Sequence, residues 1–425
     1  MTAQPISRQI AWVLFATAMP AYMLLSPSVL GHMGIPYDSP QGFPLAKFHI
    51  GSYCLIFAWF MALSSHGNPL RVMSAQMARH RLLGIYWVSM VGVFFWVVFR
   101  HGTSGAAFII EALWMPVVAA FALDLFDARR RRQTLQLVML LLAGNALLAV
   151  GEALSGANLV PASLESSGLV AEVQFRATAF LGHPLHNALI TASLLPAVTL
   201  LPLSRVGQIM LILLLLLSLL AFGGRTSIGL AVLLYGPYFF ISACRKALRG
   251  GFNYLQLTGG SLALMLGTTG VLGFVAATGL GDRIFKNMKM DNSAGVRLKV
   301  WDAFDYLSES DFWFGIAPID IDHIALLMGL DPKYEAIENF WIYNFMQFGV
   351  VGFTPFVVAL ACLVLVLWRA ATPPMRVATL LYFLVASTAN TLAAKTMSLM
   401  LLVVVILAGA TQQRLPTTVA ARGLS

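Results

Sequence analysis

The sequence predicts an all-α polytopic membrane protein. Apolar residue types make up 59% of its 425 residues, and charged types make up only 11%. A soluble domain carries roughly 25% charged residues, so this composition indicates that lipid is the main solvent. Long apolar runs such as residues 206–222 show no alternation of period two. They therefore favour membrane helices over a closed barrel.

Twelve apolar stretches approach the roughly 20 residues that a helix needs to cross the hydrocarbon core. They are residues 10–30, 48–64, 82–99, 106–126, 135–154, 185–203, 206–222, 226–244, 254–280, 340–368, 377–390 and 396–410. We interpret the first as a membrane helix and not as a cleaved signal peptide, because no small-residue cleavage site stands out near it. The last two stretches are short, and their division near Lys395 stays open.

The distribution of basic residues sets the orientation. With a cytoplasmic N-terminus, every second loop is cytoplasmic, and these loops hold most of the arginines and lysines: Arg71, Arg79, Arg81, Arg129 to Arg132, Arg205, Arg245, Lys246, Arg249, Arg369 and Arg376. The positive-inside rule then places both termini in the cytoplasm. We attribute the net charge of +9 to this topology and not to nucleic-acid binding.

The hydropathy pattern divides the chain into three parts. Residues 1–280 hold nine membrane helices with short loops, residues 281–339 form a large periplasmic loop, and residues 340–425 hold three more helices and a cytoplasmic tail. Within the large loop, residues 293–307 have the spacing of an amphipathic helix, with Trp301 on its apolar face. Residues 320–329 are expected to form a second short helix.

Four arginines lie on the side that is otherwise poor in basic residues: Arg100, Arg176, Arg225 and Arg297. Charges at or near membrane helix ends on that side are costly and therefore informative. Arginine matches phosphate oxygens in a bidentate manner, so the set predicts an outward-facing pocket for a diphosphate. The alternative is that each arginine reaches lipid headgroups or pairs with a carboxylate such as Glu111 or Glu152.

The string from Gly182 to Asn187 leads into the helix that follows Arg176. Pro184 suits a first helical turn, and the helix N-terminus favours an anion. His183, His186 and Asn187 are therefore candidate substrate-binding residues. A metal at the two histidines, or at Asp320, Asp322 and His323, is the weaker alternative, and we expect no metal.

Glu338 and Asn339 stand where the large loop enters the next membrane helix. A carboxylate at this point can accept a proton from a sugar hydroxyl. It can equally be a partner of the helix N-terminus.

The chain resembles the superfamily of O-antigen ligases and O-antigen polymerases of bacterial surface-glycan assembly. The resemblance covers the layout of about twelve helices with a large loop before the last three. Three local stretches carry it: Arg176 to Asn187; Gly224 to Ser227; and Arg297, Trp301, Phe314, Gly315 and Glu338 to Gly352. The family's ligases commonly have His-Asn where this chain has Glu338-Asn339, which favours a polymerase-type member.

The resemblance implies a metal-independent glycosyltransferase of the bacterial inner membrane, without a cofactor and with a GT-C-like fold. Its donor would be an oligosaccharide on undecaprenyl diphosphate, and its acceptor a glycan at the periplasmic face. Membrane lipids and other polysaccharide-assembly proteins would be its remaining partners. Arg225 and Arg297 would stabilise the leaving diphosphate, and the base would be Glu338 or His323. The implied substrate-binding residues are Arg176, Arg100, His183, His186, Asn187, Glu152, Trp301, His323 and Asn339.

Two other activities compete with a polymerase of exopolysaccharide or O-antigen repeats. An O-antigen ligase would transfer glycan from the same donor to a different acceptor. A polysaccharide transporter or flippase is less favoured, because the sequence shows no clear inverted repeat and no paired broken helices. The outward-facing arginines argue only weakly against a third alternative, a non-enzymatic membrane scaffold.

Overall fold

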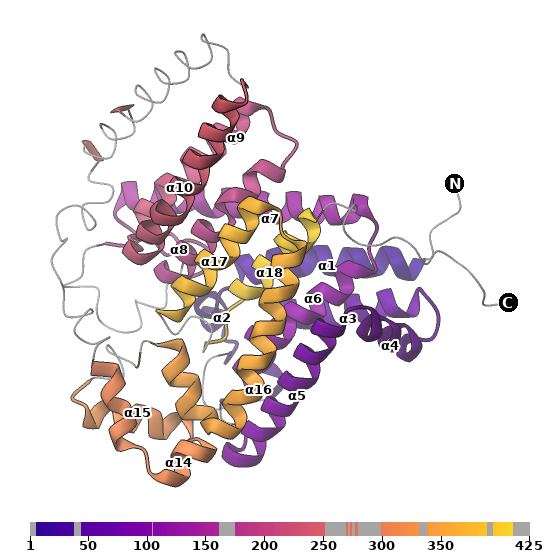
Figure 1. The fold of residues 1–425 in the computed structure, drawn as a ribbon, viewed down its shortest axis with the longest axis vertical. Helices are drawn as coiled ribbons and strands as arrows, with labels where there is room; N and C mark the ends of the chain where they lie inside the picture. The colour runs from indigo at the N-terminus through magenta and orange to yellow at the C-terminus, as the bar shows by residue number, and fades with distance from the viewer. Residues whose placement is uncertain are drawn as a thin grey trace.

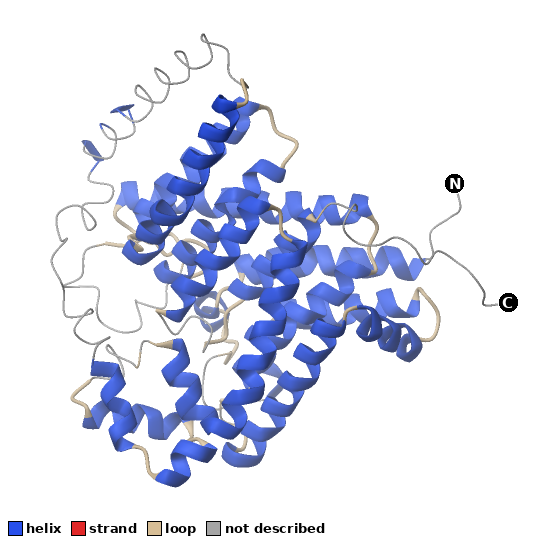
Figure 2. Cartoon of the chain, viewed as in Figure 1, coloured by secondary structure: helices blue, strands red, loops and turns tan. Residues whose placement is uncertain are grey.

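The computed structural model is all-α throughout the residues that it describes (Figure 1, Figure 2). These are residues 6–37, 44–103, 105–160, 175–250, 269–270, 273, 277–278, 299–330, 337, 339–388 and 394–410. The helices pack on one another without a sheet within this part of the chain. The predicted helical fold class is therefore confirmed.

The first part of the chain holds α1 (Ile6–Leu24), α2 (Pro27–His32), η1 (Pro44–Lys47), α3 (Ile50–Ser64), α4 (Pro69–Arg79), α5 (Arg81–His101), η2 (Ile109–Trp114), α6 (Met115–Asp124), α7 (Ala128–Ser155), α8 (Pro184–Leu194), η5 (Leu195–Leu200), α9 (Arg205–Phe222) and α10 (Arg225–Leu248). The second part holds η6 (Val300–Tyr306), α14 (Glu309–Phe314), α15 (Pro318–Leu327), α16 (Phe340–Ala370), α17 (Pro373–Ser387) and α18 (Ser398–Gly409).

Five of these helices are long and apolar enough to cross a membrane: α5, α7, α9, α10 and α16. A sixth span is possible within the described residues if α3 and α4 count together, although the chain bends by 99° between them. With this many apolar helices, the chain is a multi-pass membrane protein.

Several other expected spans are shorter or broken in the structure. Residues 106–126 are divided between η2, which is a π-helix, and α6. Residues 185–203 form α8 and then the 3-10 helix η5. The final two stretches give α17 and α18, of 15 and 12 residues. Most of residues 254–280 lies outside the described residues.

Sequence signals at the helix ends agree with the observed boundaries. The Asp127 side chain caps α7 by accepting the backbone N–H of Arg130 at 2.9 Å, and the Ser204 hydroxyl caps α9 in the same way. Gly156 and Gly223 end α7 and α9 in the left-handed conformation, with φ of 67° and 63°.

The helices share two chemically different ends, which we name by their residues. The basic end contains Arg8, Arg79, Arg81, Arg131 and Arg369 at the starts of α1, α5 and α7 and the ends of α4 and α16. Hydrogen bonds from Arg8 to His66 and to the Leu125 carbonyl connect the start of α1 to the turn after α3 and to the end of α6.

The loop end lies at the other terminus of α7, about 42 Å away at 1.5 Å per residue. It contains the end of α7, the segment 175–183, the start of α8 and the turn between α9 and α10.

Helix α16 is broken at Gly349, which has φ of 59° and ψ of 178°. The break frees carbonyls that must find new donors inside the protein. The backbone N–H of Ile316 donates to the Met346 carbonyl at 2.8 Å, and the indole N–H of Trp96 donates to the Phe348 carbonyl at 3.0 Å. His101 Nε2 also lies 3.0 Å from the Gln347 carbonyl. We call this set of contacts the kink clasp.

The two predicted helices of the large loop meet different outcomes. The segment expected at residues 320–329 is helical as α15, and Gly329 follows it with φ of 72°. The segment expected at 293–307 lies partly outside the described residues, and its described part is the short 3-10 helix η6. Val300 is buried, but the Trp301 side chain is 60% exposed, so the predicted apolar face is wrong at Trp301.

The kink clasp requires glycine at position 315. A Cβ there would lie 2.8 Å from the backbone nitrogen of Gly349, and φ is 79°. We expect Gly315→Ala to lower the free energy of unfolding by about 1–3 kcal/mol, from backbone strain together with the clash. Thermal unfolding in detergent measures this loss.

Gly329→Ala is the matched control, because Gly329 has a similar φ of 72° but open space within 4 Å. Equal losses in the two variants would show that only the positive φ matters and that the close approach at the clasp does not.

Candidate functional site

Arg176 and Arg225 lie together at the loop end. Arg176 Nε donates to the carbonyl of Phe222, the last residue of α9, at 3.2 Å. The neighbouring Ala177 N–H donates to the Ala221 carbonyl at 3.2 Å. Arg225 begins α10 only three residues after Phe222, so Arg176 contacts the backbone turn that leads into Arg225.

A close approach at Gly224 brings the same turn against α8. A Cβ on Gly224 would lie 2.5 Å from the Cβ of Ala188, so any larger residue would push the two elements apart. The N-terminal turns of α8 and α10 are therefore adjacent. Both helix starts carry partial positive charge, in addition to the charge of the arginines.

His183 and His186 stand at the start of α8. Their ring centroids are 4.7 Å apart, and His183 caps the helix by accepting the Leu185 N–H at 3.3 Å. Burial, followed by the proximity of His186 and Arg176, holds the pKa of His183 well below its ordinary value. Because Nδ1 already accepts the Leu185 N–H, the Nε2 atom of the neutral imidazole carries the proton and is a hydrogen-bond donor.

A buried amide pair fixes the start of α8 to the middle of α7. Asn145 Nδ2 donates to Asn187 Oδ1 at 2.8 Å, and Asn187 Nδ2 donates to the Thr178 carbonyl at 2.6 Å. The Asn145 oxygen also accepts the Phe180 N–H at 3.0 Å. Both asparagines have no exposed surface, so Asn187 is placed to position its neighbours.

Glu152 performs a similar role at the end of α7. Its Oε2 accepts the N–H groups of Thr178 and Ala179 at 2.9 and 2.8 Å, and its Oε1 accepts the Leu159 N–H at 3.0 Å. The side chain is fully buried. Its carboxylate thus holds the segment that carries Arg176, and it forms none of the ion pairs within the described residues.

Four other predicted site residues lie on different elements. Arg100 stacks over the Phe314 ring, 5.5 Å from its centroid, beside the kink clasp. Trp301 stacks on Phe304, His323 is exposed on α15, and Asn339 caps α16 by accepting the N–H groups of residues 341 and 342. Arg297 and Glu338 lie outside the described residues.

Glu111 joins a second buried polar group. It accepts the backbone N–H of His49 at 2.7 Å and the Ser52 hydroxyl at 2.6 Å, and Tyr22 bonds to that same hydroxyl at 2.8 Å. These contacts join α1, α3 and the π-helix η2, which is consistent with a structural role for Glu111.

Asn145 and Thr178 support the site but are not among the residues predicted from the sequence. Asn145 had a usable signal, because an amide within an apolar membrane helix requires a partner inside the protein. Thr178 contributes its backbone N–H and C=O, which leave no pattern in the sequence.

No known protein-family model matches the chain. Among the described residues, no group of three or more His, Cys, Asp and Glu side chains could hold a metal ion. The paired histidines of α8 accordingly have no third metal ligand in that part of the chain.

We expect Glu152→Gln to destabilise the loop end. The amide can accept fewer hydrogen bonds than the carboxylate, and each backbone N–H left unpaired costs roughly 1–3 kcal/mol. Hydrogen exchange of the amides at 177–180 should rise, together with a lower midpoint of thermal unfolding.

Glu309→Gln is the control, because Glu309 is an exposed residue in the first turn of α14. Unchanged exchange at 177–180 in the Glu152 variant would mean that the carboxylate does not hold the segment.

Proposed function

We propose that the chain is a bacterial inner-membrane glycosyltransferase that polymerises repeat units carried on undecaprenyl diphosphate. The observation that supports this most is the hydrogen bond from Arg176 to the turn between α9 and α10, where Arg225 begins α10 and Gly224 lies against α8. Two guanidinium groups and two helix N-termini form an environment suited to a diphosphate.

The proposed chemistry is a displacement at the anomeric carbon of the donor sugar. The acceptor hydroxyl attacks that carbon and loses its proton to a base, while the bond to the lipid diphosphate breaks. Arg176 and Arg225 stabilise the negative charge that develops on the departing diphosphate. Arg297 would assist them, and either Glu338 or His323 would be the base.

The proposed topology has about twelve spans in a GT-C-like arrangement, with both termini in the cytoplasm. The arrangement of charge supports it, because the basic end collects arginines from α4, α5, α7 and α16. The positive-inside rule would then place the loop end and its arginine pair in the periplasm.

The buried supports around the pair favour a built site over isolated arginines in contact with lipid. Glu152, Asn145 and Asn187 are each completely buried, and each is bonded to the segment 178–183. Preorganisation of this kind is what electrostatic stabilisation of a leaving group requires.

Replacement of the arginine pair tests the proposal. In a bacterium that depends on this chain for its glycan, we expect Arg225→Ala and Arg176→Ala each to reduce polymer by about 100-fold or more. Single repeat units should accumulate on the lipid carrier. Gel analysis of the glycan and of the lipid-linked intermediates measures both effects.

Arg245→Ala is the matched control, since Arg245 is an exposed arginine near the opposite terminus of α10. Membrane fractions should contain all variants in equal amounts. Long chains stranded on the carrier would instead indicate a ligase, and normal polymer from both site variants would refute the arginine site.

A further inference from the structure

A second cationic region lies at the basic end, far from the arginine pair. Here the structure contains a cavity of about 400 Å³ between the junction of α4 and α5, the end of α6, the start of α7 and the ends of α16 and α18. Four arginines and one aspartate line it, together with a histidine: Arg79, Arg81, Arg131, Arg369, Asp124 and His80. Four positive charges against one negative charge leave +3 with the histidine neutral.

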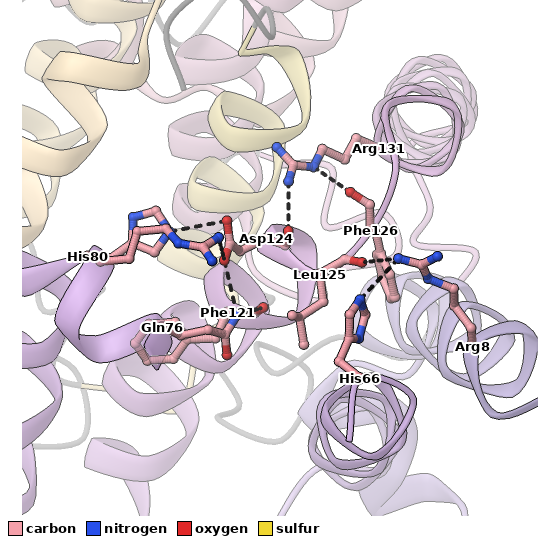
Figure 3. Close-up of polar contacts among 10 residues, drawn as sticks. Arg8, His66, Gln76, His80, Phe121, Asp124, Leu125, Phe126 and Arg131 are labelled. Carbon is pink, nitrogen blue, oxygen red and sulfur yellow. Dashed lines mark hydrogen bonds and ion pairs between the residues drawn. The ribbon is translucent and has the colours of Figure 1, made fainter. Parts of the chain in front are cut away.

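The single aspartate is already engaged by the protein. Asp124 lies 3.1 Å from His80 and 3.6 Å from Arg79, and it accepts a hydrogen bond from Gln76 at 3.2 Å. Arg131 donates to the carbonyls of Asp124 and Phe126, as Figure 3 shows. These contacts hold the wall of the cavity in place.

Arg81 and Arg369 differ from this fixed set. Both are exposed, and neither forms a hydrogen bond or ion pair with another of the described residues. They line the same cavity from the start of α5 and the end of α16. Two arginines that line one cavity and form no ion pair among the described residues create a positive potential that attracts an anion.

The remaining wall of the cavity is apolar and includes Leu82, Leu83, Leu123, Val366 and Leu407. A site for a small hydrated anion does not need such a wall. An anion attached to a hydrocarbon chain does, because it presents both surfaces at once.

Helix α4, which ends at the cavity, has the features of a helix at a membrane surface. Helix α4 turns by 99° from α3, and it carries exposed Leu70 and Arg71 while Met73 packs on the core. A short basic amphipathic helix perpendicular to a membrane-directed helix is typical of the membrane surface. Its last residue, Arg79, lines the cavity.

We propose that this cavity binds the phosphate headgroup of an anionic phospholipid. Arg81 and Arg369 contact the phosphate oxygens, and the upper part of an acyl chain lies along the leucine wall. This site is independent of the proposed glycan chemistry, because it lies at the opposite end of the bundle from Arg176 and Arg225.

The test uses the full chain in a neutral detergent. Native mass spectrometry and thermal unfolding are recorded with phosphatidylglycerol, with phosphatidylcholine and with inorganic phosphate. We expect phosphatidylglycerol alone to bind and to raise the unfolding midpoint. Arg81→Gln/Arg369→Gln should weaken that binding about tenfold or more, since two charge-assisted contacts are lost.

Arg245→Gln/Arg249→Gln is the matched control, because it removes two arginines near the end of α10 that do not line the cavity. Arg369→Glu alone is a second variant and should also weaken the selective binding, because it places a negative charge beside the phosphate. Equal weakening in the control pair, or unchanged binding in the cavity variants, would overturn the site. If inorganic phosphate raised the unfolding midpoint as much as phosphatidylglycerol does, the ligand would be a soluble anion and not a lipid.

Discussion

Backbone groups that leave a helix inside a membrane protein must find partners within the chain, since lipid offers none. This constraint explains the positions of the buried polar side chains. Glu152 accepts hydrogen bonds from three amides on two non-helical segments, and Glu111 accepts one from the amide at the start of α3. Trp96 donates to a carbonyl freed at the kink of α16. Polar side chains within apolar segments thus supply the hydrogen bonds that the backbone loses where a helix breaks.

The same constraint organises the candidate site. Arg176 can lie beside Arg225 because the segment that carries it is bonded on one side to Glu152 and on the other to the end of α9. The short helix α8 begins at this point, and the buried Asn145–Asn187 pair fixes its start. The backbone that carries Arg176 is therefore held by buried polar groups whose hydrogen bonds are made within the chain.

Much of this could be predicted from composition and hydropathy. The helical class, the apolar stretches that became α5, α7, α9, α10 and α16, and the short helix α15 all follow from local patterns. The 99° bend after α3 and the π-helix at Glu111 could not be foreseen, because tertiary hydrogen bonds decide where an apolar run breaks. For the site, the sequence identified Arg176, Arg225 and the histidines of α8. It could not reveal that Glu152 accepts hydrogen bonds from backbone amides. Nor could it reveal that Arg100 stacks on Phe314 beside the kink clasp, away from Arg176.

The kink clasp joins the segment between α14 and α15 to the membrane helices α5 and α16. Ile316, between α14 and α15, donates into the break of α16, while Trp96 and His101 contact the same break from α5. Gly315 and Gly349 approach too closely for any intervening side chain. As a result, α14 cannot shift relative to the break of α16 without losing the hydrogen bond from Ile316 to the Met346 carbonyl. A displacement of α14 is therefore expected to move α16 with it, through their contact at Gly315 and Gly349.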